Sequence, residues 1–478
     1  MPSALTTEAA GSTVAATGRG LPASLDREMR ALLGDAWRTD PDERLAYSYD
    51  NSRRQSLPDA VALPVDAAQV QALVRACRTA RVPLVPRGRA TNTTGAAVPI
   101  DGGVVVSMER MDRIVDIRPG DRCAVVQPGV LNGALQQALA GHGLFWPPDP
   151  TSAAFSTVGG NLACNAGGPR AVKYGASRDN VLAITAVTGA GELVTLGTAT
   201  TKGSTGYDLQ RMFVGSEGTL GLIVEATLRL VPAPQDRRAL RAIYRDVSSA
   251  ARAVARLMAQ PVTPSMLEFM DAHAVGLARD VGGADLPIDA GALLMIEADG
   301  PAAHLEADLA ALRDAAAGDG LVSLESADDE SARDRLWAAR KALSPALRTL
   351  APGKINEDVV VPVSRIPDLV DGVQGISAAA RLPIVCFGHA GNGNLHVNLM
   401  YDPADADQSA RARDAMGRVF TLALELGGTL SGEHGIGLAK RDFMPRAVGA
   451  PTLELMRQLK ATFDPDGIMN PGKLLPPP

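Results

Sequence analysis

The sequence predicts an α+β protein built from two or three domains. With 478 residues, the chain is longer than one hydrophobic core usually supports. Short runs rich in Val and Ile dominate up to about residue 230 with few helical segments between them, which predicts a mixed sheet. From residue 240 onward, Ala-rich helical segments alternate with strands, which predicts a sheet with helices packed on one face.

The N-terminal region is expected to begin with a tail and a strand–helix–strand unit. Residues 1–22 are rich in Ala, Thr, Ser and Gly and lack the apolar run of a signal peptide, so we expect them to be disordered. Residues 57–86 predict a strand, a helix capped by Asp66 and a second strand, because apolar residues from Val70 onward recur at helical spacing. Further strands are expected over 103–107, 114–117, 123–127, 181–187, 192–196 and 221–231.

A domain boundary is predicted at Pro232 and Pro234, which stand beside a charged run. Beyond it, the sequence predicts helices over 247–259, 302–316, 329–349 and 404–427, and strands over 292–297, 355–361, 382–388 and 394–400. The chain ends in a predicted helix that carries Leu459 and Phe463, followed by a turn rich in Pro and Gly.

Composition excludes several classes of protein. The net charge is −6 and no basic run occurs, so a nucleic acid is not an expected partner. No run of 18 apolar residues occurs, so we expect no transmembrane segment. The four cysteines are scattered, which argues against an iron–sulfur cluster or a zinc ribbon and fits buried thiols in a reducing cytoplasm.

The most informative motif is GHAGNGNLHVN, which holds two of the six histidines. Asn392-Gly393 is a strong signal for a two-residue hairpin turn, which would place His389 directly opposite His396. Residues opposed in this way have Cβ atoms roughly 4.5–5.5 Å apart, which suits a shared metal ion. Together with Glu433 in SGEHGIG, they predict a three-ligand metal site with open positions. The alternatives are a hydrogen-bonded histidine pair without metal and the iron site of an oxygenase.

His434 directly follows Glu433 and is the candidate general base. The glycines at 432 and 435 allow this loop to approach a substrate closely. A histidine titrates near neutrality, which suits proton abstraction. The alternative is a solvent-exposed histidine without a chemical role.

Three glycine-punctuated segments precede these motifs. They are the loop of residues 86–95, the block of residues 147–168 with two Gly-Gly pairs, and the segment 213–221. Loops of small residues with many free backbone N–H groups can wrap a diphosphate, and Gly-Gly pairs allow close approach of the backbone to a flat ligand. Taken singly, the loop of residues 86–95 is at least as well explained as a surface loop. A structural bulge could explain one Gly-Gly pair of 147–168, but two pairs favour cofactor contact.

The order and spacing of these segments resemble the FAD-binding domain of the vanillyl-alcohol oxidase / p-cresol methylhydroxylase superfamily. The motifs GHxGxGNxH, GEHGIG and NPGK resemble its FAD-linked oxidase branch, which includes D-lactate dehydrogenases, the glycolate oxidase flavin subunit and D-2-hydroxyglutarate dehydrogenases. The resemblance covers roughly residues 45–478. It implies a two-part FAD-binding domain over 23–233, a substrate or cap domain with an antiparallel sheet covered by helices over 234–430, and a C-terminal segment, 431–478, that returns to the flavin.

The chain departs from the family pattern in places. Ala90, Asn92 and Ala96 stand where the phosphate loop of relatives usually carries glycine, and Asn392 stands where many relatives carry Asp. Apart from His142, no histidine lies in the N-terminal flavin loops, so we expect non-covalent FAD.

The resemblance also implies roles for individual residues. Arg340, Ser344, Lys354 and Asn398 are expected to hold the substrate carboxylate, and without the resemblance Arg340 would be interpreted as an exposed helix charge. His389, His396 and Glu433 are expected to bind a divalent metal, either zinc or manganese. The residues expected to contact FAD are Pro86, Arg87, Gly88, Arg89, Thr91, Asn92, Thr93, Thr94, Gly95, Pro148, Thr151, Gly159, Gly160, Asn161, Asn165, Gly167, Gly168, Tyr174, Glu217, Gly218, Gly221, Ile223 and Asn470.

The activity implied by the resemblance is the oxidation of a D-2-hydroxy acid, such as D-lactate or D-2-hydroxyglutarate, to the 2-oxo acid. Hydride would pass to flavin N5 and then, as electrons, to a quinone, a cytochrome or an electron-transfer flavoprotein rather than to NAD. Three alternatives stay open: a glycolate oxidase-type subunit that needs partner chains, a flavin-dependent transferase, and, more distantly, a metal-dependent hydrolase. We expect a cytoplasmic protein; attachment to a membrane surface and a homodimer both stay open.

Overall fold

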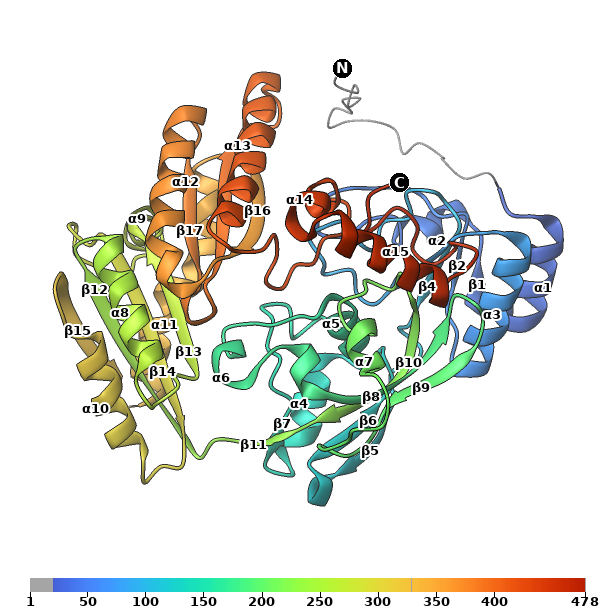
Figure 1. The fold of residues 1–478 in the computed structure, drawn as a ribbon, viewed down its shortest axis with the longest axis horizontal. Coiled ribbons are helices and arrows are strands. Elements are labelled where there is room, and N and C mark those ends of the chain that lie inside the picture. Colours follow the sequence, from blue (N-terminus) through green and yellow to red (C-terminus); the bar gives the residue numbers. More distant parts are fainter. Residues whose placement is uncertain (1–19, 328, 478) are drawn as a thin grey trace.

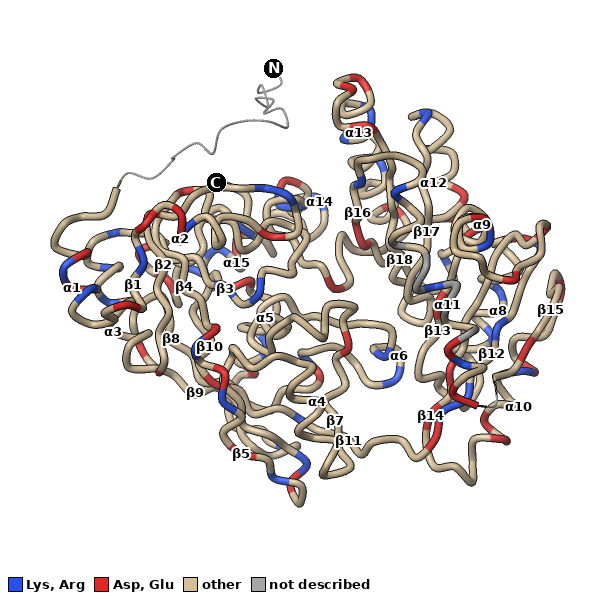
Figure 2. Tube along the Cα trace, turned by 180° about the vertical axis from the view of Figure 1, so that it is seen from behind, with Lys and Arg blue, Asp and Glu red and all other residues tan. Residues whose placement is uncertain are grey.

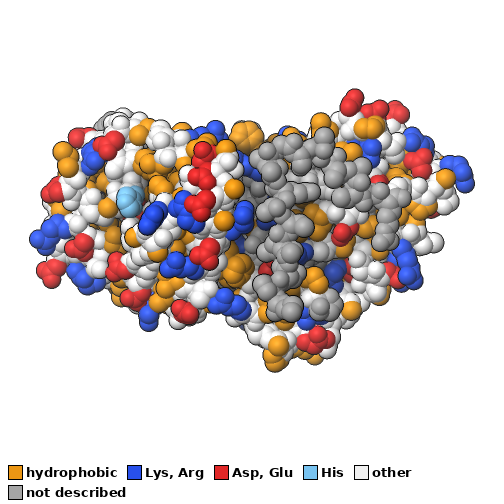
Figure 3. Space-filling view, turned by 90° about the horizontal axis from the view of Figure 1, so that it is seen from above, with side chains coloured by type: hydrophobic (Ala, Val, Ile, Leu, Met, Phe, Trp, Pro, Cys, Tyr) orange, Lys and Arg blue, Asp and Glu red, His pale blue; other side chains and the backbone are white. Residues whose placement is uncertain are grey.

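The computed structural model describes residues 20–327 and 329–477, without the side chains of 335, 338, 339, 341, 342 and 344. A disordered tail was predicted over residues 1–22, of which residues 1–19 lie outside the described residues. Helix α1 begins at Ala23. Figure 1 shows an N-terminal part at one end and a sheet covered by helices at the other. Figure 2 shows basic and acidic residues interspersed along the trace of both parts, and Figure 3 shows their side chains interspersed over the described surface seen from above.

The N-terminal part contains two main sheets, not the single mixed sheet that the sequence predicted. The first has the strand order β1-β2-β4-β3, in which β2, β4 and β3 are parallel. Asp66 caps helix α3 as predicted, because its side chain accepts a hydrogen bond from the backbone N–H of Gln69. The elements of this sheet are α1 (Ala23–Leu33), β1 (Trp37–Arg38), α2 (Pro41–Leu45), β2 (Ala60–Ala62), α3 (Ala67–Ala80), β3 (Leu84–Arg87) and β4 (Val104–Ser107).

The second sheet is antiparallel, with the order β5-β6-β10-β8-β9. Its strands are β5 (Ile114–Arg118), β6 (Cys123–Val126), β8 (Val181–Thr188), β9 (Leu193–Gly197) and β10 (Gly221–Arg229). Four short helices lie between them: α4 (Asn132–Ala140), α5 (Val158–Cys164), α6 (Ala171–Tyr174) and α7 (Leu209–Phe213). Strands β7 (Leu144–Phe145) and β11 (Val231–Pro232) pair at the exit toward the next part.

The second part is built on a seven-stranded antiparallel sheet with the order β15-β12-β14-β13-β17-β18-β16. Its strands are β12 (Asp236–Tyr244), β13 (Met266–Asp271), β14 (Ala292–Gly300), β15 (Leu321–Ala327), β16 (Gly353–Val360), β17 (Ile384–His389) and β18 (Asn394–Tyr401). One face is covered by α8 (Val247–Ala259), α10 (Leu305–Ala316), α12 (Ile366–Ala380) and α13 (Ala406–Glu425). The expectation of helices on only one face is wrong, because α9 (Ala272–Asp280) and α11 (Glu330–Ala346) pack on the other.

In the C-terminal segment, α14 (Met444–Val448) packs against the core of the second part, and α15 (Ala450–Phe463) follows it and lies over the N-terminal part (Figure 1). Leu459 and Phe463 pack against the core of the five-stranded sheet, and Met469 forms a bridge with Leu84 of β3. Among the described residues, no helix combines the length and apolar character needed to cross a membrane.

Candidate functional site

A cavity of about 480 Å³ opens between the two parts, and the glycine-rich segments form one end of it. These segments pack closely at their glycines: a Cβ on Gly88 would lie 2.4 Å from the Thr157 hydroxyl, and one on Gly218 would lie 2.1 Å from the Pro86 ring. The residues expected to contact FAD that line the cavity are Pro86, Arg87, Gly88, Arg89, Thr91, Asn92, Thr93, Thr151, Gly159, Gly160, Asn161, Glu217, Gly218, Gly221 and Ile223.

The other residues expected to contact FAD do not line this cavity; they are Thr94, Gly95, Pro148, Asn165, Gly167, Gly168, Tyr174 and Asn470. The Tyr174 hydroxyl instead lies 2.8 Å from Asp299 on β14, so it ties the two parts together. The Asn470 amide donates to the carbonyls of Ala96 and Glu217, which fixes the C-terminal segment beside the cavity.

The histidine hairpin has a register different from the predicted one. Residues Ala390–Asn392 form a 3₁₀ turn and Gly393 has a φ of +71°, so His389 pairs with Asn394, and His396 pairs with Phe387. A four-residue loop therefore replaces the two-residue turn, and the histidines are diagonal neighbours on one face instead of direct partners. The imidazoles still meet, because the two Nε2 atoms lie 3.4 Å apart.

His389, His396 and Glu433 converge as the sequence predicted. Glu433 Oε1 lies 3.5 Å from the Nε2 atom of each histidine. Ligand atoms held about 2.1 Å from a tetrahedral zinc ion would be about 3.4 Å apart, which agrees with these separations. The three donors therefore fit a small divalent cation, and the cavity borders His396 and Glu433.

The charges at these three residues are set by their surroundings. Burial lowers the pKa of His389, but Glu268 and Glu433 outweigh burial and raise this pKa to about 10. Burial lowers the pKa of His396 to about 3, which keeps this imidazole neutral. Burial raises the pKa of Glu433, but His389 more than offsets it and brings the value to about 2. A cation here would face one carboxylate and one neutral imidazole, and would displace a proton from the other.

Glu268 is a site residue that the sequence motifs did not reveal. It lies opposite His389 on the neighbouring strand, its carboxylate contacts His389 Nδ1, and it accepts a hydrogen bond of 3.0 Å from Arg340 Nε. A carboxylate on Nδ1 leaves Nε2 as the metal-binding nitrogen, a common arrangement around metals. The available signal was an acidic residue inside the otherwise apolar strand MLEFMD.

The residues expected to hold substrate lie on the same face of the sheet but are not equally accessible. Arg340 lines the cavity, with its guanidinium 4.5 Å above the ring of Phe387. Lys354 is half-buried, and burial lowers its pKa. Asn398 is buried, does not line the cavity, and donates to the carbonyls of Val385 and His396. The side chain of Ser344 lies outside the described residues.

Asn356 and Phe387 line the cavity as well, and neither was predicted. The amide oxygen of Asn356 is buried and has no hydrogen-bond partner among the described residues, so it is available to a ligand. The signal in the sequence was the polar triplet Asn-Glu-Asp before the apolar end of a strand.

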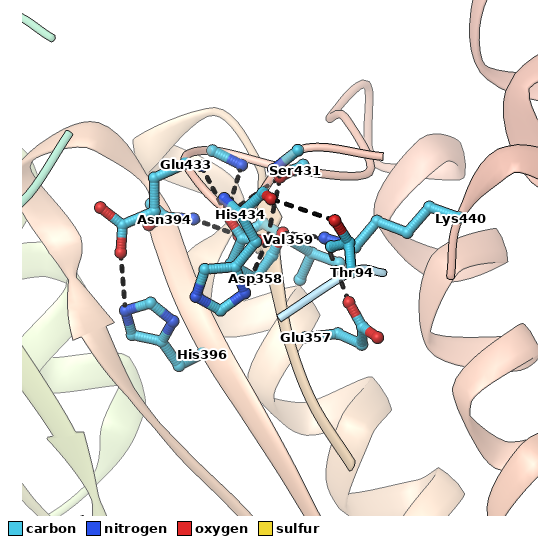
Figure 4. Close-up of polar contacts among 12 residues, drawn as sticks. Thr94, Glu357, Asp358, Val359, Asn394, His396, Ser431, Glu433, His434 and Lys440 are labelled. Atoms are coloured by element: carbon cyan, nitrogen blue, oxygen red, sulfur yellow. Dashed lines mark hydrogen bonds and ion pairs between the residues drawn. The ribbon is translucent and has the colours of Figure 1, made fainter. Parts of the chain in front are cut away.

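His434 also borders the cavity, and its ring stacks on that of His396 with centroids 5.3 Å apart (Figure 4). Its Nδ1 lies within ion-pair distance of Asp358, 3.2 Å from Oδ1, although this nitrogen makes no hydrogen bond among the described residues. Glu357, Asp358 and His434 form a second group with metal-ligand chemistry. Lys440 Nζ already lies 3.2 Å from Glu357 and 2.6 Å from Asp358, so an ammonium occupies the position a cation would take.

Comparisons with known proteins agree with this geometry. Residues 58–197 match the family described as FAD binding domain, and residues 233–474 match FAD linked oxidases, C-terminal domain. The glycolate oxidase subunit GlcD of Bacillus subtilis (strain 168) is 39% identical over 90% of this chain and 92% of its own length. D-lactate dehydrogenase of Anaerostipes hadrus is 35% identical over 93% of this chain and 94% of its own.

Among solved structures, p-cresol methylhydroxylase with substrate bound superposes with a TM-score of 0.80 over 96% of this chain and 98% of its own, at 16% identity. That likeness establishes the fold alone. The chain therefore belongs to the FAD-linked oxidase family and has the fold of the vanillyl-alcohol oxidase / p-cresol methylhydroxylase superfamily.

Proposed function

We propose that this protein is an FAD- and metal-dependent dehydrogenase that oxidises a D-2-hydroxy acid to the 2-oxo acid. One observation carries the proposal. The three candidate metal ligands, together with His434 and Arg340, lie at the cavity that the glycine-rich segments of the N-terminal part also line; we call these segments the flavin-type loops. We assign FAD binding to residues 23–233, substrate binding to 234–430, and to 431–478 the return to the flavin.

The protein side chains divide the work of binding and proton transfer. Arg340 offers its guanidinium to the substrate carboxylate, with Lys354, Ser344 and Asn398 in support. His434 Nε2 accepts the hydroxyl proton, because Nδ1 faces Asp358. Phe387 and Arg340 cover the substrate end of the cavity and keep water from it.

His389, His396 and Glu433 would hold the divalent metal, for which zinc and manganese are the candidates. A bound divalent metal supplies Lewis-acid polarisation of the substrate hydroxyl. Bound FAD supplies the hydride acceptor, and its electrons then pass to a quinone, a cytochrome or an electron-transfer flavoprotein.

A panel of D- and L-2-hydroxy acids with an artificial dye acceptor, run with and without chelator, tests the proposal. We expect turnover of a D-acid, such as D-lactate or D-2-hydroxyglutarate, or of glycolate, which is achiral. Turnover should be lost after complete removal of the metal. Full activity in the metal-free protein would eliminate the Lewis-acid role, and bound flavin that no 2-hydroxy acid reduces would favour a transferase.

A second candidate function is supported by the name of one relative, a glycolate oxidase subunit that is 39% identical. In that case the chain would be a flavin subunit that works only with partner chains. Dye reduction by the purified chain alone decides between the two, because a dependent subunit would turn over only after its partners are added.

A further inference from the structure

The loop of residues 431–439 carries both the proposed metal ligand Glu433 and the proposed base His434, and it has no regular secondary structure before Arg441. Its placement therefore depends on what its backbone N–H groups bind. Two buried carboxylates, one from each part of the molecule, accept hydrogen bonds from five of these groups, and neither carboxylate lies in the loop itself.

The first carboxylate is Asp358 of β16, which is fully buried. Its Oδ2 accepts hydrogen bonds from the backbone N–H groups of residues 432, 433 and 434, at 2.7, 2.6 and 3.1 Å. Its Oδ1 accepts from the Ser431 hydroxyl at 3.0 Å and from Lys440 Nζ at 2.6 Å (Figure 4). The ring Nδ1 of His434 also lies 3.2 Å from Oδ1. Every hydrogen-bond partner of both oxygens is a donor.

The second carboxylate is Glu217, which comes from the N-terminal part and is 3% exposed. Its Oε1 accepts from the N–H of Ile436 at 2.6 Å and its Oε2 from the N–H of Gly437 at 2.8 Å. The remaining N–H of this stretch, that of Gly435, donates to the Ser431 hydroxyl at 2.9 Å. All six N–H groups from 432 to 437 are thus accounted for.

A further contact reaches the carbonyl side of the loop. The Asn92 amide donates to the His434 carbonyl at 2.8 Å, and Asn92 stands where the family pattern has glycine. The Asn92 side chain therefore links the backbone of His434 to the loop of residues 86–95 by a hydrogen bond that a glycine at this position could not make.

We propose that Asp358 and Glu217 are the positioning residues of the active-site loop, and that together they fix Glu433 and His434 relative to both parts of the molecule. We call these two carboxylates and their bonds to the loop the clamp. The role of His434 as base rests on the function proposed above, whereas the clamp rests on the contacts alone. Neither carboxylate touches substrate in this account; both act through the loop backbone, and Asp358 also lies 3.2 Å from the ring Nδ1 of His434.

The chemistry of the clamp supplies a sharp test, because both oxygens of each carboxylate receive only donors. In Asp358→Asn or Glu217→Gln, no orientation of the amide avoids placing its NH₂ group against another donor. The matched control is Asp464→Asn. Asp464 is also buried, accepts from two backbone N–H groups and pairs with a lysine, Lys460, but it lies outside the cavity lining.

The experiment compares the three variants with the wild-type holoenzyme in two measurements. Amide hydrogen exchange over residues 432–437 should be faster in Asp358→Asn and Glu217→Gln and unchanged in Asp464→Asn. Anaerobic reduction of the bound flavin at saturating D-2-hydroxy acid, measured per bound FAD, should slow by about 10²-fold in the first two variants, the size of effect expected from misplacing a reacting group by about 1 Å.

Two results would overturn the proposal. One is exchange in the loop that is no faster in either clamp variant than in Asp464→Asn. The other is a loss of reduction rate no greater than in that control. If the wild-type flavin is not reduced by any 2-hydroxy acid, the proposed function fails, while the exchange measurement still decides for or against the clamp. Glu217→Gln keeps the test open if Asp358→Asn does not fold.

Discussion

At the scale of single residues, the rare residue types were predictable from the sequence and the common ones were not. Six histidines in 478 residues make a pair in one motif conspicuous, whereas Glu268 and Asp358 are two among 53 acidic residues. Their roles come from strand pairing: Glu268 lies opposite His389, and Asp358 lies opposite His396. Pairing of distant strands is not encoded in local spacing, so these two acids could not be identified from the motifs.

The base assignment predicts the effect of His434→Ala. The variant should bind FAD normally but reduce it at least about 10²-fold more slowly with substrate, because general-base terms are usually of this size. Stopped-flow absorbance of the flavin measures the rate. Bleaching at the wild-type rate would show that another group removes the proton.

The charges of the metal site predict that metal affinity rises with pH. Since the pKa of His389 is raised to about 10 and the pKa of His396 is lowered to about 3, a metal binding near pH 8 displaces one proton, from His389. Affinity should therefore increase by about tenfold per pH unit between pH 7 and 9 and level off above the His389 pKa. Calorimetry in buffers of different ionisation enthalpy counts the proton released.

Glu268→Gln is the control for this prediction, because a neutral amide does not stabilise the imidazolium of His389. The pH dependence of metal affinity should flatten in this variant. A slope equal to that of the wild type would mean that Glu268 does not set the charge of His389.

The contacts of Arg340 predict a specific effect on substrate binding. Arg340→Lys should raise the KM for the hydroxy acid by about 10-fold or more, because an ammonium cannot grip a carboxylate with two parallel hydrogen bonds. Arg313→Lys, on the opposite side of the sheet, is the matched control. Equal KM values for the two variants would contradict the carboxylate role.

At the scale of elements, the sequence predicted that a hairpin joins the two histidines but not its register. The Asn392-Gly393 signal favoured a two-residue turn, yet only Gly393 has a positive φ, and the turn is a 3₁₀ segment. Both registers put the imidazoles within reach of one ion, so the predicted metal site does not depend on which register forms. Helices α9 and α11 cover the face of the sheet that carries the site. The sequence of these segments does not indicate which face of the sheet they cover.

This hairpin loop should tolerate no side chain at Gly393. A Cβ there would lie 1.9 Å from the Val361 carbonyl oxygen at a φ of +71°. Gly427→Ala, with a φ of +78° and open space, should cost only the conformational penalty of about 1–2 kcal/mol. Gly393→Ala should cost at least about 1 kcal/mol more in the free energy of unfolding, measured by urea denaturation.

At the scale of the whole molecule, the cavity lies between two parts with separate cores, and the C-terminal segment joins them. The family resemblance predicted this return, but the path of the segment is set by tertiary contacts such as the Asn470 amide with Glu217 and Ala96. Local propensity cannot predict contacts across more than 200 residues of chain, so the walls of the cavity were only partly anticipated.

The two-part cavity predicts how FAD affects stability. FAD binds only the folded protein in this account, so excess cofactor at 100 times its Kd should stabilise the fold by about 2.7 kcal/mol and raise Tm. Differential scanning calorimetry of the apoprotein with increasing FAD measures the shift. A Tm that does not depend on FAD would be incompatible with a binding site formed by these loops.

The central claim is that the flavin-type loops and the metal site serve one reaction on a D-2-hydroxy acid. Its most direct test is a single anaerobic mixing experiment, in which the FAD-loaded, metal-loaded protein meets D-lactate, D-2-hydroxyglutarate, glycolate or an L-2-hydroxy acid, and absorbance of the oxidised flavin is followed. We predict rapid bleaching with at least one D-acid or glycolate, none with L-acids, and a large loss of rate after the metal is removed. Flavin that stays oxidised with every acid, or bleaches equally fast without metal, would contradict the claim.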